Sequence, residues 1–338
     1  MKKIVALIVS FLLVVSMTAC SGGAAASSTT APASDTAVTS GNQDKSKQLY
    51  INVELANNLP YLYDHQIGTS QAGKELGVQT KYVGPAEYDV NAMITAFEQA
   101  IAEKPNGIVV MGVDPSLNVE IQKAIAAGIP VVTVDADLPD SGRVAFVGTG
   151  NIAAGELGGE YIAKLLNGKG QVAIMTKPGQ SNLDERVQGY QNAFAKYPGI
   201  EVVQIADTGA DPVVAAQAAA TLMQKYPNIG ALACVESAGG TGAATAVKEA
   251  GKQGQVKIIS MDRDNAVIQA IQDGTITATV AQQTALMSYY AIEILYNLNN
   301  SNVKITTDNK LAGISGTPVN IDTGCVIVDK TNAQYFMR

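Results

Sequence analysis

Short β-branched runs alternate with amphipathic stretches from Leu49 almost to the end of the chain. The runs are bounded by Gly, Pro or Asp, as strands are. The stretches between them repeat apolar residues at spacings of three and four, as helices do. The pattern predicts strands at Leu49–Leu55, Gln79–Val83, Gly107–Val113, Pro130–Asp135, Val144–Gly148, Gln171–Met175, Glu201–Ala206, Ala231–Val235, Val256–Met261, Ile276–Ala281 and Cys325–Val328.

The amphipathic stretches predict helices at Val90–Lys104, Ser116–Ala127, Ala153–Leu166, Leu183–Lys196, Pro212–Lys225, Gly242–Ala250, Asn265–Gln272 and Thr284–Asn297. Apolar strands that are each followed by a helix need both sheet faces covered, so the sheets should be mainly parallel. Ten or more such strands are better divided between two sheets than placed in one, although a single large sheet is the alternative. We therefore expect an α/β fold of two doubly wound parallel-sheet lobes joined by a multi-strand hinge.

The composition changes near residue 47 and suggests the domain boundaries. Ser21–Ser46 is almost entirely Ser, Ala, Thr and Gly with a few charges, which cannot bury enough apolar surface to fold. We expect a flexible tether at 20–47. The N-terminal lobe should consist of 48–148 plus 283–308, and the C-terminal lobe of 149–282 plus 309–338, because the chain should return to the first lobe before it finishes in the second.

The first residues have the pattern of a lipoprotein signal peptide, predicted at 1–19. Lys2 and Lys3 precede the apolar run Ile4–Val15, which is too short to span a bilayer with ordinary flanks, and small residues stand directly before Cys20. Cleavage would leave Cys20 as the mature N-terminus, and lipid on its thiol would hold the protein on the outer face of the cell membrane. An ordinary signal peptide cleaved nearby and an uncleaved anchor are the alternatives. Both would export the protein.

The charge of the chain argues against a nucleic-acid partner. Lys and Arg number 23 against 30 Asp and Glu, and loss of Lys2 and Lys3 with the signal peptide would leave a net charge of about −9. This acidity argues against a surface that would neutralise phosphates, and no local cluster of Lys and Arg overrides it. We also expect a monomer.

The residues that metal sites and nucleophilic catalysis need are scarce. Cys234 and Cys325 stand in apolar runs, where each is expected to pack as a small hydrophobic residue, and with His65 they lack metal-ligand spacing. The Gly-rich clusters at 148–150 and 239–242 fit neither dinucleotide nor P-loop patterns. We therefore expect no metal, no cofactor and no enzymatic activity.

Polar residues follow several of the predicted strands. In an open parallel sheet, ligands bind beyond the carboxyl ends of the strands. Carboxylates, amides and a guanidinium suit a dense array of hydroxyl groups, and an aromatic ring can stack on the C–H face of a sugar. These residues could instead be helix caps, surface ion pairs or loop packing. The candidate ligand-binding residues are Asn58, Tyr61, Asp135, Asp137, Arg186, Glu236, Asp262 and Gln282.

Four segments, taken in order, resemble the periplasmic sugar-binding proteins of the ribose-binding type. They are 130–135 (PVVTVD), 184–190 (DERVQGY), 258–262 (IISMD) and 274–282 (GTITATVAQ), and the likeness covers about 49–330. The resemblance implies that Asp135, Arg186, Asp262 and Gln282 hold sugar hydroxyls. It further implies that Asn58 and Tyr61 occupy the first binding loop.

The chain departs from the ribose binders at several positions. They have Arg directly after the first Asp, where this chain has Ala136 and then Asp137, and they have Asn where Glu236 falls. They also have an aromatic residue near 208–212, where this chain has none. The departures favour another monosaccharide, a polyol, an amine-bearing sugar or a furanosyl quorum signal.

The resemblance implies a solute-binding protein that captures its ligand between two lobes and delivers it to an ABC transporter permease. A sensory subunit that presents the same ligand to a histidine kinase or chemoreceptor is the alternative. The sequence does not separate the two, because a docking surface is not a motif.

Overall fold

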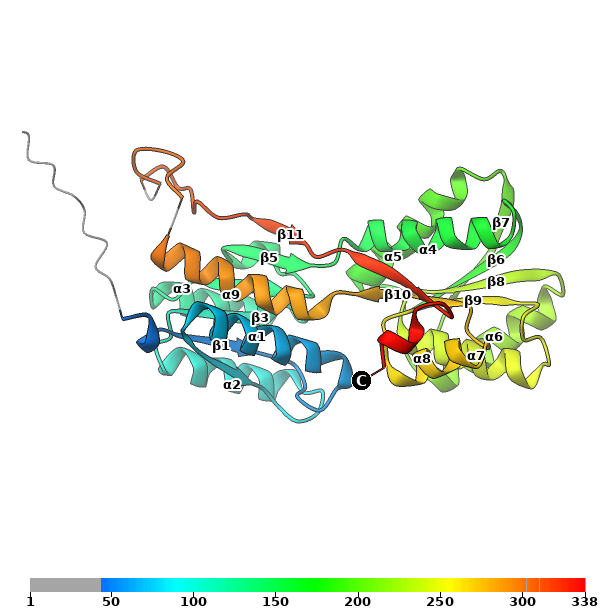
Figure 1. The fold of residues 1–338 in the computed structure, drawn as a ribbon, viewed down its shortest axis with the longest axis horizontal. Coiled ribbons are helices and arrows are strands. Elements are labelled where there is room, and N and C mark those ends of the chain that lie inside the picture. The colour runs from blue at the N-terminus through cyan, green and yellow to red at the C-terminus, as the bar shows by residue number, and fades with distance from the viewer. Residues whose placement is uncertain (1–43, 302, 310, 338) are drawn as a thin grey trace, which may run out of the picture. The chain divides into compact units, whose positions relative to one another are not determined.

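The computed structural model describes residues 44–301, 303–309 and 311–337 (Figure 1). The predicted signal peptide, Cys20 and the tether as far as residue 43 lie outside the described residues. Of the predicted tether only 44–47 is described, and there Lys45–Lys47 form a 3-10 helix, η1, capped by the Asp44 side chain.

The first sheet carries the first half of the folded chain. Its strand order is β11-β5-β4-β3-β1-β2, and every neighbouring pair is parallel. One face is covered by α2 and α3, whose Phe97 and Ile121 are buried against it, and the other by α1 and α9. The strands are β1 (Leu49–Val53), β2 (Gln79–Val83), β3 (Gly107–Met111), β4 (Val131–Val134), β5 (Ala145–Gly148) and β11 (Asn320–Asp322), and the helices are α1 (Tyr63–Leu76), α2 (Val90–Ala102), α3 (Leu117–Ala126) and α9 (Thr284–Asn300).

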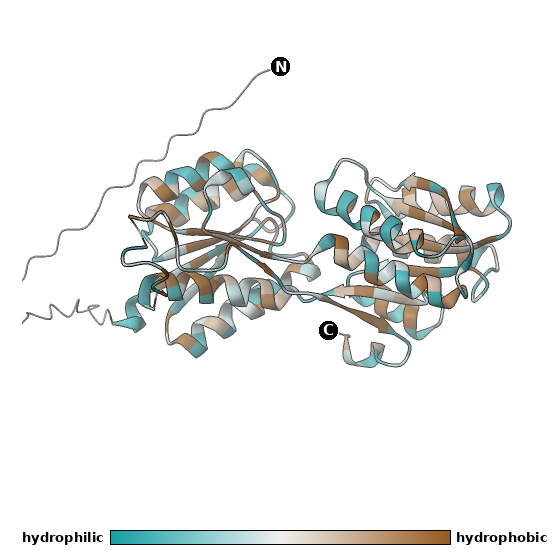
Figure 2. Cartoon of the chain, turned by 90° about the horizontal axis from the view of Figure 1, so that it is seen from above, coloured by the Kyte–Doolittle hydropathy of each residue, from teal (hydrophilic) through white to brown (hydrophobic). Residues whose placement is uncertain are grey.

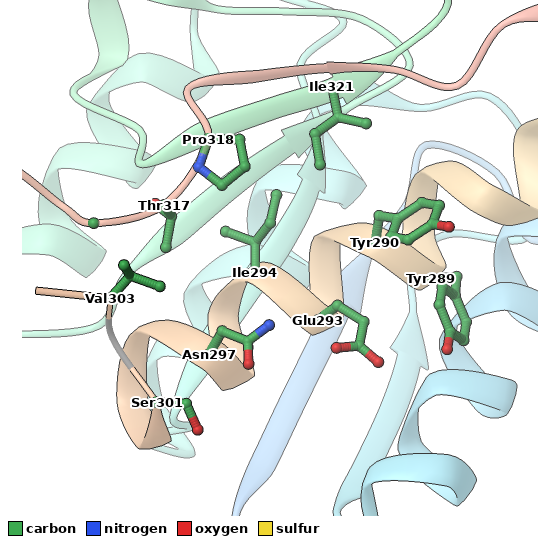
Figure 3. A pocket seen from close by; sticks show the side chains of 11 residues that line it. Tyr289, Tyr290, Glu293, Ile294, Asn297, Ser301, Val303, Thr317, Pro318 and Ile321 are labelled. Atoms are coloured by element: carbon green, nitrogen blue, oxygen red, sulfur yellow. The ribbon is translucent and has the colours of Figure 1, made fainter. Parts of the chain in front are cut away.

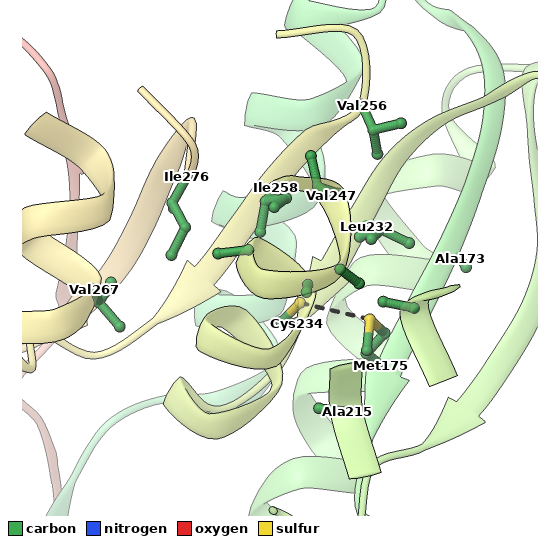
Figure 4. Close-up of a cluster of buried hydrophobic side chains, with 14 of the residues drawn as sticks. Ala173, Met175, Ala215, Leu232, Cys234, Val247, Val256, Ile258, Val267 and Ile276 are labelled. Atoms are coloured by element: carbon green, nitrogen blue, oxygen red, sulfur yellow. Dashed lines mark hydrogen bonds between the residues drawn. The ribbon is translucent and has the colours of Figure 1, made fainter. Parts of the chain in front are cut away.

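The second sheet has the same plan, with strand order β12-β10-β9-β8-β6-β7, and only β12 runs antiparallel to its neighbour. Helices α6, α7 and α8 cover one face through an aliphatic core that includes Leu232, Val247 and Ile258 (Figure 4), and α4 and α5 cover the other. The strands are β6 (Lys169–Thr176), β7 (Gly199–Asp207), β8 (Ile229–Cys234), β9 (Lys257–Met261), β10 (Ala278–Gln282) and β12 (Cys325–Asp329), and the helices are α4 (Asn151–Leu165), α5 (Ser181–Ala195), α6 (Pro212–Lys225), α7 (Ser237–Glu249) and α8 (Asn265–Gln272).

The expected α/β fold with two mainly parallel sheets is confirmed. Each strand that the apolar runs predict is present within two residues of the predicted bounds. The reason is visible in Figure 2, where apolar colour concentrates along the strands and polar colour on the outer sides of the helices. No helix in the described ranges is both long enough and apolar enough to span a bilayer.

Among the α-helices and strands of the described residues, two are absent from the sequence prediction, α1 and β11. Helix α1 buries small and polar residues, including Gly68, Thr69 and Ala72, so it lacks the apolar stripe that marks a helix. Strand β11 is three residues long and carries one apolar residue. Because β11 pairs with β5, part of the range 309–338, which the sequence interpretation gave to the C-terminal lobe, belongs to the first sheet instead.

Within the described residues the chain passes between the two sheets through three short connections: after β5, after β10 and after β11. The connections are bonded to one another. The Thr323 amide donates to the Gly148 carbonyl at 2.8 Å, the Gly150 amide to Asp322 Oδ1 at 2.8 Å, and Gln283 Nε2 to the Thr323 carbonyl at 2.6 Å. The expected multi-strand hinge therefore consists of three connecting segments that are hydrogen-bonded to one another.

Candidate functional site

Two aspartates stand at matching places in the two sheets. Asp135 directly follows β4 and Asp262 directly follows β9. Both have left-handed backbone conformations, with φ of 62° and 67°, which non-glycine residues seldom adopt. Each amide donates to the neighbouring strand, Asp135 to Val147 and Asp262 to Val280. Backbone strain of this kind costs about 1–3 kcal/mol and is found at binding sites, where it directs a side chain.

A hydrogen-bonded chain joins these aspartates. The Tyr61 hydroxyl donates to Asp135 Oδ1 at 2.8 Å and accepts from Gln282 Nε2 at 3.1 Å. Gln282 Nε2 also donates to Asp262 Oδ1 at 2.7 Å. Tyr61 belongs to the 3-10 helix Pro60–Leu62 that follows β1, and Gln282 is the last residue of β10. Four residues that the sequence predicts as ligand contacts are thus gathered across the two sheets.

Arg186 supplies a buried positive charge beside the hydrogen-bonded residues Asp135, Tyr61, Gln282 and Asp262. Its side chain is only 4% exposed. Nε donates to Asn151 Oδ1 at 3.0 Å and Nη1 to the Val235 carbonyl at 3.0 Å, while Nη2 makes no hydrogen bond to the described part of the chain. No carboxylate of the described residues forms a salt bridge with it, although a buried charge is costly without a partner. Arg186 therefore offers an unused, fixed donor to an acceptor from outside the protein.

Glu236 caps a helix and keeps one oxygen available. Its Oε1 accepts from the Gly239 amide at 2.8 Å, which caps α7, and from Thr208 Oγ1 at 3.0 Å. Oε2 has no hydrogen bond among the described residues. The capping role and the ligand role considered from the sequence are therefore compatible in this side chain.

Two predicted ligand residues lie outside this group. Asp137 accepts from the Arg143 guanidinium through both carboxylate oxygens, from Thr133 Oγ1 and from the Leu138 amide. Arg143 in turn donates to the carbonyl of Val319 just before β11, so Asp137 holds the edge of the first sheet together. The Asp137 carboxylate thus accepts four hydrogen bonds from its own lobe and none from the Tyr61 group.

Asn58 is the other. Its side chain is exposed and donates to Glu87 at 3.3 Å, and its amide donates to the Ala86 carbonyl. The neighbouring Asn57 is the more enclosed residue of the two, with Oδ1 buried and without a hydrogen-bond partner. The assignment of Asn58 to the first binding loop stays a prediction, with Asn57 as the more enclosed neighbour.

The structure adds a buried ion pair that the sequence did not indicate. His65 Nδ1 lies 2.7 Å from Glu54 Oε1, and neither side chain is exposed. Burial alone would lower the pKa of His65, but the adjacent Glu54 carboxylate outweighs it and the net shift is upward. The His65 ring packs at 6.1 Å from the Tyr61 ring, so the pair supports the residue that bridges the two aspartates. Neither local spacing nor composition could have revealed a pair made by a strand end and a helix.

A second ion pair lies next to the group and also joins the two lobes. Arg263, after β9, contacts the Asp64 carboxylate on α1, and the Thr284 hydroxyl donates to the same oxygen at 2.8 Å. A small pocket lined by Tyr61, Asp262 and Gln282 adjoins this ion pair.

The protonation of the site follows from its burial. Burial raises the pKa of Asp262 to about 6, and the Arg186 charge and the Gln282 hydrogen bond offset only part of that shift. Burial and then the nearby Asp135 and Asp262 charges raise the pKa of Tyr61 well above its ordinary value of 10, so its hydroxyl remains a donor. The site therefore presents acceptors, amides, a hydroxyl and one cation, which is a set suited to hydroxyl groups.

Metal ligation has no support among the described residues, in which no three His, Cys, Asp or Glu side chains gather around a common point. Cys234 and Cys325 are free thiols. Burial raises the pKa of Cys234 well above its ordinary value, and that of Cys325 to about 11, so both are protonated at neutral pH.

Residues 61–302 match the protein family described as periplasmic binding protein domain. The arabinose-binding protein AraP from Geobacillus stearothermophilus superposes with a TM-score of 0.81 at 34% identity, covering 86% of this chain and 100% of that one. The D-allose-binding periplasmic protein of Escherichia coli is 29% identical over 260 residues, which are 74% of this chain and 84% of the relative. XylFII in a complex with LytSN superposes with a TM-score of 0.67 at 28% identity, covering 85% of this chain and 99% of that one.

Proposed function

Because the chain belongs to the periplasmic binding protein domain family, whose members act outside the cytoplasm, we propose that it captures a monosaccharide or related polyol between its lobes and delivers it to an ABC transporter permease. The observation that carries the proposal is the hydrogen-bonded chain from Asp135 through Tyr61 and Gln282 to Asp262. The relatives named above support it, since arabinose and allose are their ligands by name.

The binding residues in this proposal have complementary roles. Asp135 and Asp262 accept from sugar hydroxyls, Arg186 Nη2 donates to ring or hydroxyl oxygens, and Tyr61 offers its ring to the C–H face. Glu236 Oε2 and Gln282 complete the set. A ligand that touches both lobes at once favours the closed arrangement by its differential affinity, so binding drives hinge closure and no bond is made or broken.

The same proposal includes a lipid on Cys20 that holds a monomeric protein at the outer face of the cell membrane. The small-residue sequence before Cys20 and the short apolar run at 4–15 support it. The chain between Cys20 and the first described residue would then let the lobes move relative to the membrane.

Calorimetric titration tests the binding role, after a thermal-shift panel of pentoses, hexoses and polyols has identified a ligand. Arg186→Ala should weaken binding by about 2–5 kcal/mol, or roughly 30-fold to several thousand-fold, because acceptors enclosed in the cleft lose a charged donor. Arg186→Lys should retain part of the affinity, since it keeps the charge and loses the planar fork. Gln188→Ala on the exposed side of the same helix is the matched control. Equal affinities for Arg186→Ala and Gln188→Ala would remove Arg186 from the site.

A sensory role is the second candidate, favoured by the similarity to XylFII in its complex with LytSN. The same closed pair of lobes would then dock on a sensor protein. Uptake of labelled ligand by cells with and without the gene separates the two roles: loss of uptake supports delivery, whereas normal uptake with a lost transcriptional response supports sensing.

A further inference from the structure

The segment that joins α9 to β11, residues 301–319, turns its apolar side chains outward. Val303, Ile305 and Leu311 are 64%, 62% and 87% exposed, and Val319 is 63% exposed. Scattered exposed aliphatic residues are ordinary, but several in one short segment mark a surface that contacts something else. We call the described residues of 301–319 the apolar loop.

Internal hydrogen bonds hold the apolar loop in this form. Asn309 Oδ1 accepts from the amides of Ile305 and Thr306, both at 3.0 Å, and Asn309 Nδ2 donates to the Val303 carbonyl at 2.6 Å. The Asp308 carboxylate accepts from the Leu311 amide at 3.0 Å. The loop thus satisfies its backbone internally while its aliphatic side chains face outward, which is the reverse of the usual arrangement in water.

The apolar surface continues under the loop. A cavity of about 470 Å³ separates the loop from α9, and Figure 3 shows Ile294 of α9 and Ile321 of β11 directed toward one another across it. Tyr290, whose side chain is 41% exposed, stands at its rim. None of the proposed sugar-binding residues lines this cavity, so the surface is separate from the candidate site.

The N-terminal segment leaves the fold beside this loop. The Lys45 ammonium lies 5.2 Å from the centre of the Tyr296 ring on α9. Tyr296 precedes Ser301 by five residues, which is about 7.5 Å along a helix. The first described residues therefore lie a short distance from the apolar loop, and Gln48 Nε2 donates to Asn300 Oδ1 at 2.8 Å.

A membrane anchor at Cys20 would place the apolar loop close to the bilayer. The 24 residues from Cys20 to residue 43 have an r.m.s. span of about 27 Å if flexible. A linker of this length gives an effective concentration on the order of millimolar, so even a weak contact between loop and lipid would be occupied much of the time. Exposed Lys45, Lys47 and Lys304 lie at this end, against Asp44, Asp308 and the half-buried Glu293 of the cavity wall, so these charges balance and the contact with lipid would rest on the apolar side chains.

From these observations we propose that the apolar loop is a membrane contact, which inserts Leu311, Ile305 and Val303 into the headgroup region of the bilayer that carries the anchor. The proposal rests on the membrane attachment included in the proposed function. Exposed aliphatic side chains partition into this boundary, and the apolar area that they bury sets the strength of the contact. The loop would fix the orientation of the first lobe at the membrane between rounds of ligand delivery.

The sequence contains no tryptophan, so a single substitution creates a unique fluorescent reporter. Leu311→Trp is introduced into the full-length chain, which is purified from membranes and reconstituted into vesicles. Its Trp fluorescence should lie at shorter wavelength in the vesicles than that of the same protein in detergent-free solution. It should also be quenched when lipids with brominated acyl chains replace ordinary ones. Val213→Trp is the matched control, because Val213 is 64% exposed at the start of α6 in the other lobe. Its emission should not change with the lipid.

Two results would overturn the proposal. One is an unquenched Trp at position 311 in protein that floats with the vesicles. The other is a Trp at 311 that is shielded in native membranes but not in pure lipid vesicles, which would identify a protein partner instead. Sugar affinity of the same variants and the mass of the N-terminal peptide report on the binding and anchoring parts of the proposed function separately.

Discussion

The Tyr61 hydroxyl occupies Asp135 before any ligand arrives, and this makes the effect of Tyr61→Phe unusual. In the structure the hydroxyl donates to Asp135 at 2.8 Å and accepts from Gln282 at 3.1 Å. A sugar hydroxyl that takes the same carboxylate oxygen must displace Tyr61. Phenylalanine removes the competitor and keeps the ring for stacking, so we expect Tyr61→Phe to bind the sugar more tightly than the wild type.

The size of the gain in sugar affinity follows from the Tyr61–Asp135 hydrogen bond that Tyr61→Phe removes. A hydrogen bond to a charged group contributes about 1.5–3 kcal/mol. Tyr61 and Asp135 both retain some exposure, so water can replace part of the bond and the lower figure applies. About 1.5 kcal/mol corresponds to a roughly tenfold lower Kd. The ligand-free variant should be less stable to unfolding by a similar amount, because the gain in affinity comes from the destabilised free state.

Calorimetry with the identified sugar and thermal unfolding without it measure the two quantities on the same samples. Tyr63→Phe is the control, since Tyr63 is 44% exposed and its hydroxyl has no hydrogen bond among the described residues. A Tyr61→Phe protein that binds tenfold more weakly at unchanged stability would show that the hydroxyl itself contacts the sugar. Unchanged affinity with lowered stability would show that the bond to Asp135 survives in the complex. Either result refutes the reasoning.

Three further predictions concern protonation and packing. Since the pKa of Asp262 is raised to about 6, sugar binding to its ionised form should release protons near pH 6. The binding heats measured there should therefore differ between buffers of different ionisation enthalpy. Asp262→Asn should remove this difference, and identical heats for the wild type in all buffers would contradict the assignment. Because the folded-state pKa of His65 is raised above 6.5, the stability that its pair with Glu54 contributes is fully present below pH 6.5 and is lost as the pH rises through the folded value. The stability gap between wild type and Glu54→Gln, about 3 kcal/mol at pH 6, should therefore narrow in alkaline buffer, and denaturant titrations that give a constant gap would refute the pairing. Gly68→Ala should destabilise the first lobe by more than 2 kcal/mol in chemical unfolding, because a Cβ there would lie 1.9 Å from the Ala285 carbonyl oxygen; a loss below 0.5 kcal/mol would mean that α1 and α9 can separate.

The sequence predicts those parts of this protein whose structure is decided by neighbouring residues in the chain. The apolar runs gave the strands because both faces of each sheet are covered. The residues directly after strands gathered as expected, since parallel strands bring their carboxyl ends to one edge; Asp135 and Asp262 are examples. Asp137 is only two residues farther along, but there the chain has turned toward Arg143.

The remaining features depend on partners that are distant in the sequence. Asn151, which orients Arg186, starts a helix 35 residues earlier and has no local signal of its own. His65 looks isolated in the sequence because its partner Glu54 directly follows a strand, on the other side of a loop. Such pairings are set by how elements pack, and a single sequence does not record them.

The arrangement of Asp135 and Asp262 suggests how the two lobes share the work of selecting a ligand. Each aspartate is held by a strained residue conformation and by a backbone bond to the next strand, so neither can turn aside to suit a different sugar. Tyr61 and Gln282 meanwhile each donate to one oxygen of these carboxylates, Tyr61 to Asp135 and Gln282 to Asp262. In the proposed function, a ligand would have to replace these internal bonds with better ones at both aspartates at once. A molecule whose hydroxyls reach only one of the two aspartates would leave the other carboxylate enclosed without a donor. That costs about 1–3 kcal/mol or more. Selectivity in this protein would then come chiefly from the penalty on incorrect ligands, and less from extra contacts with the correct one.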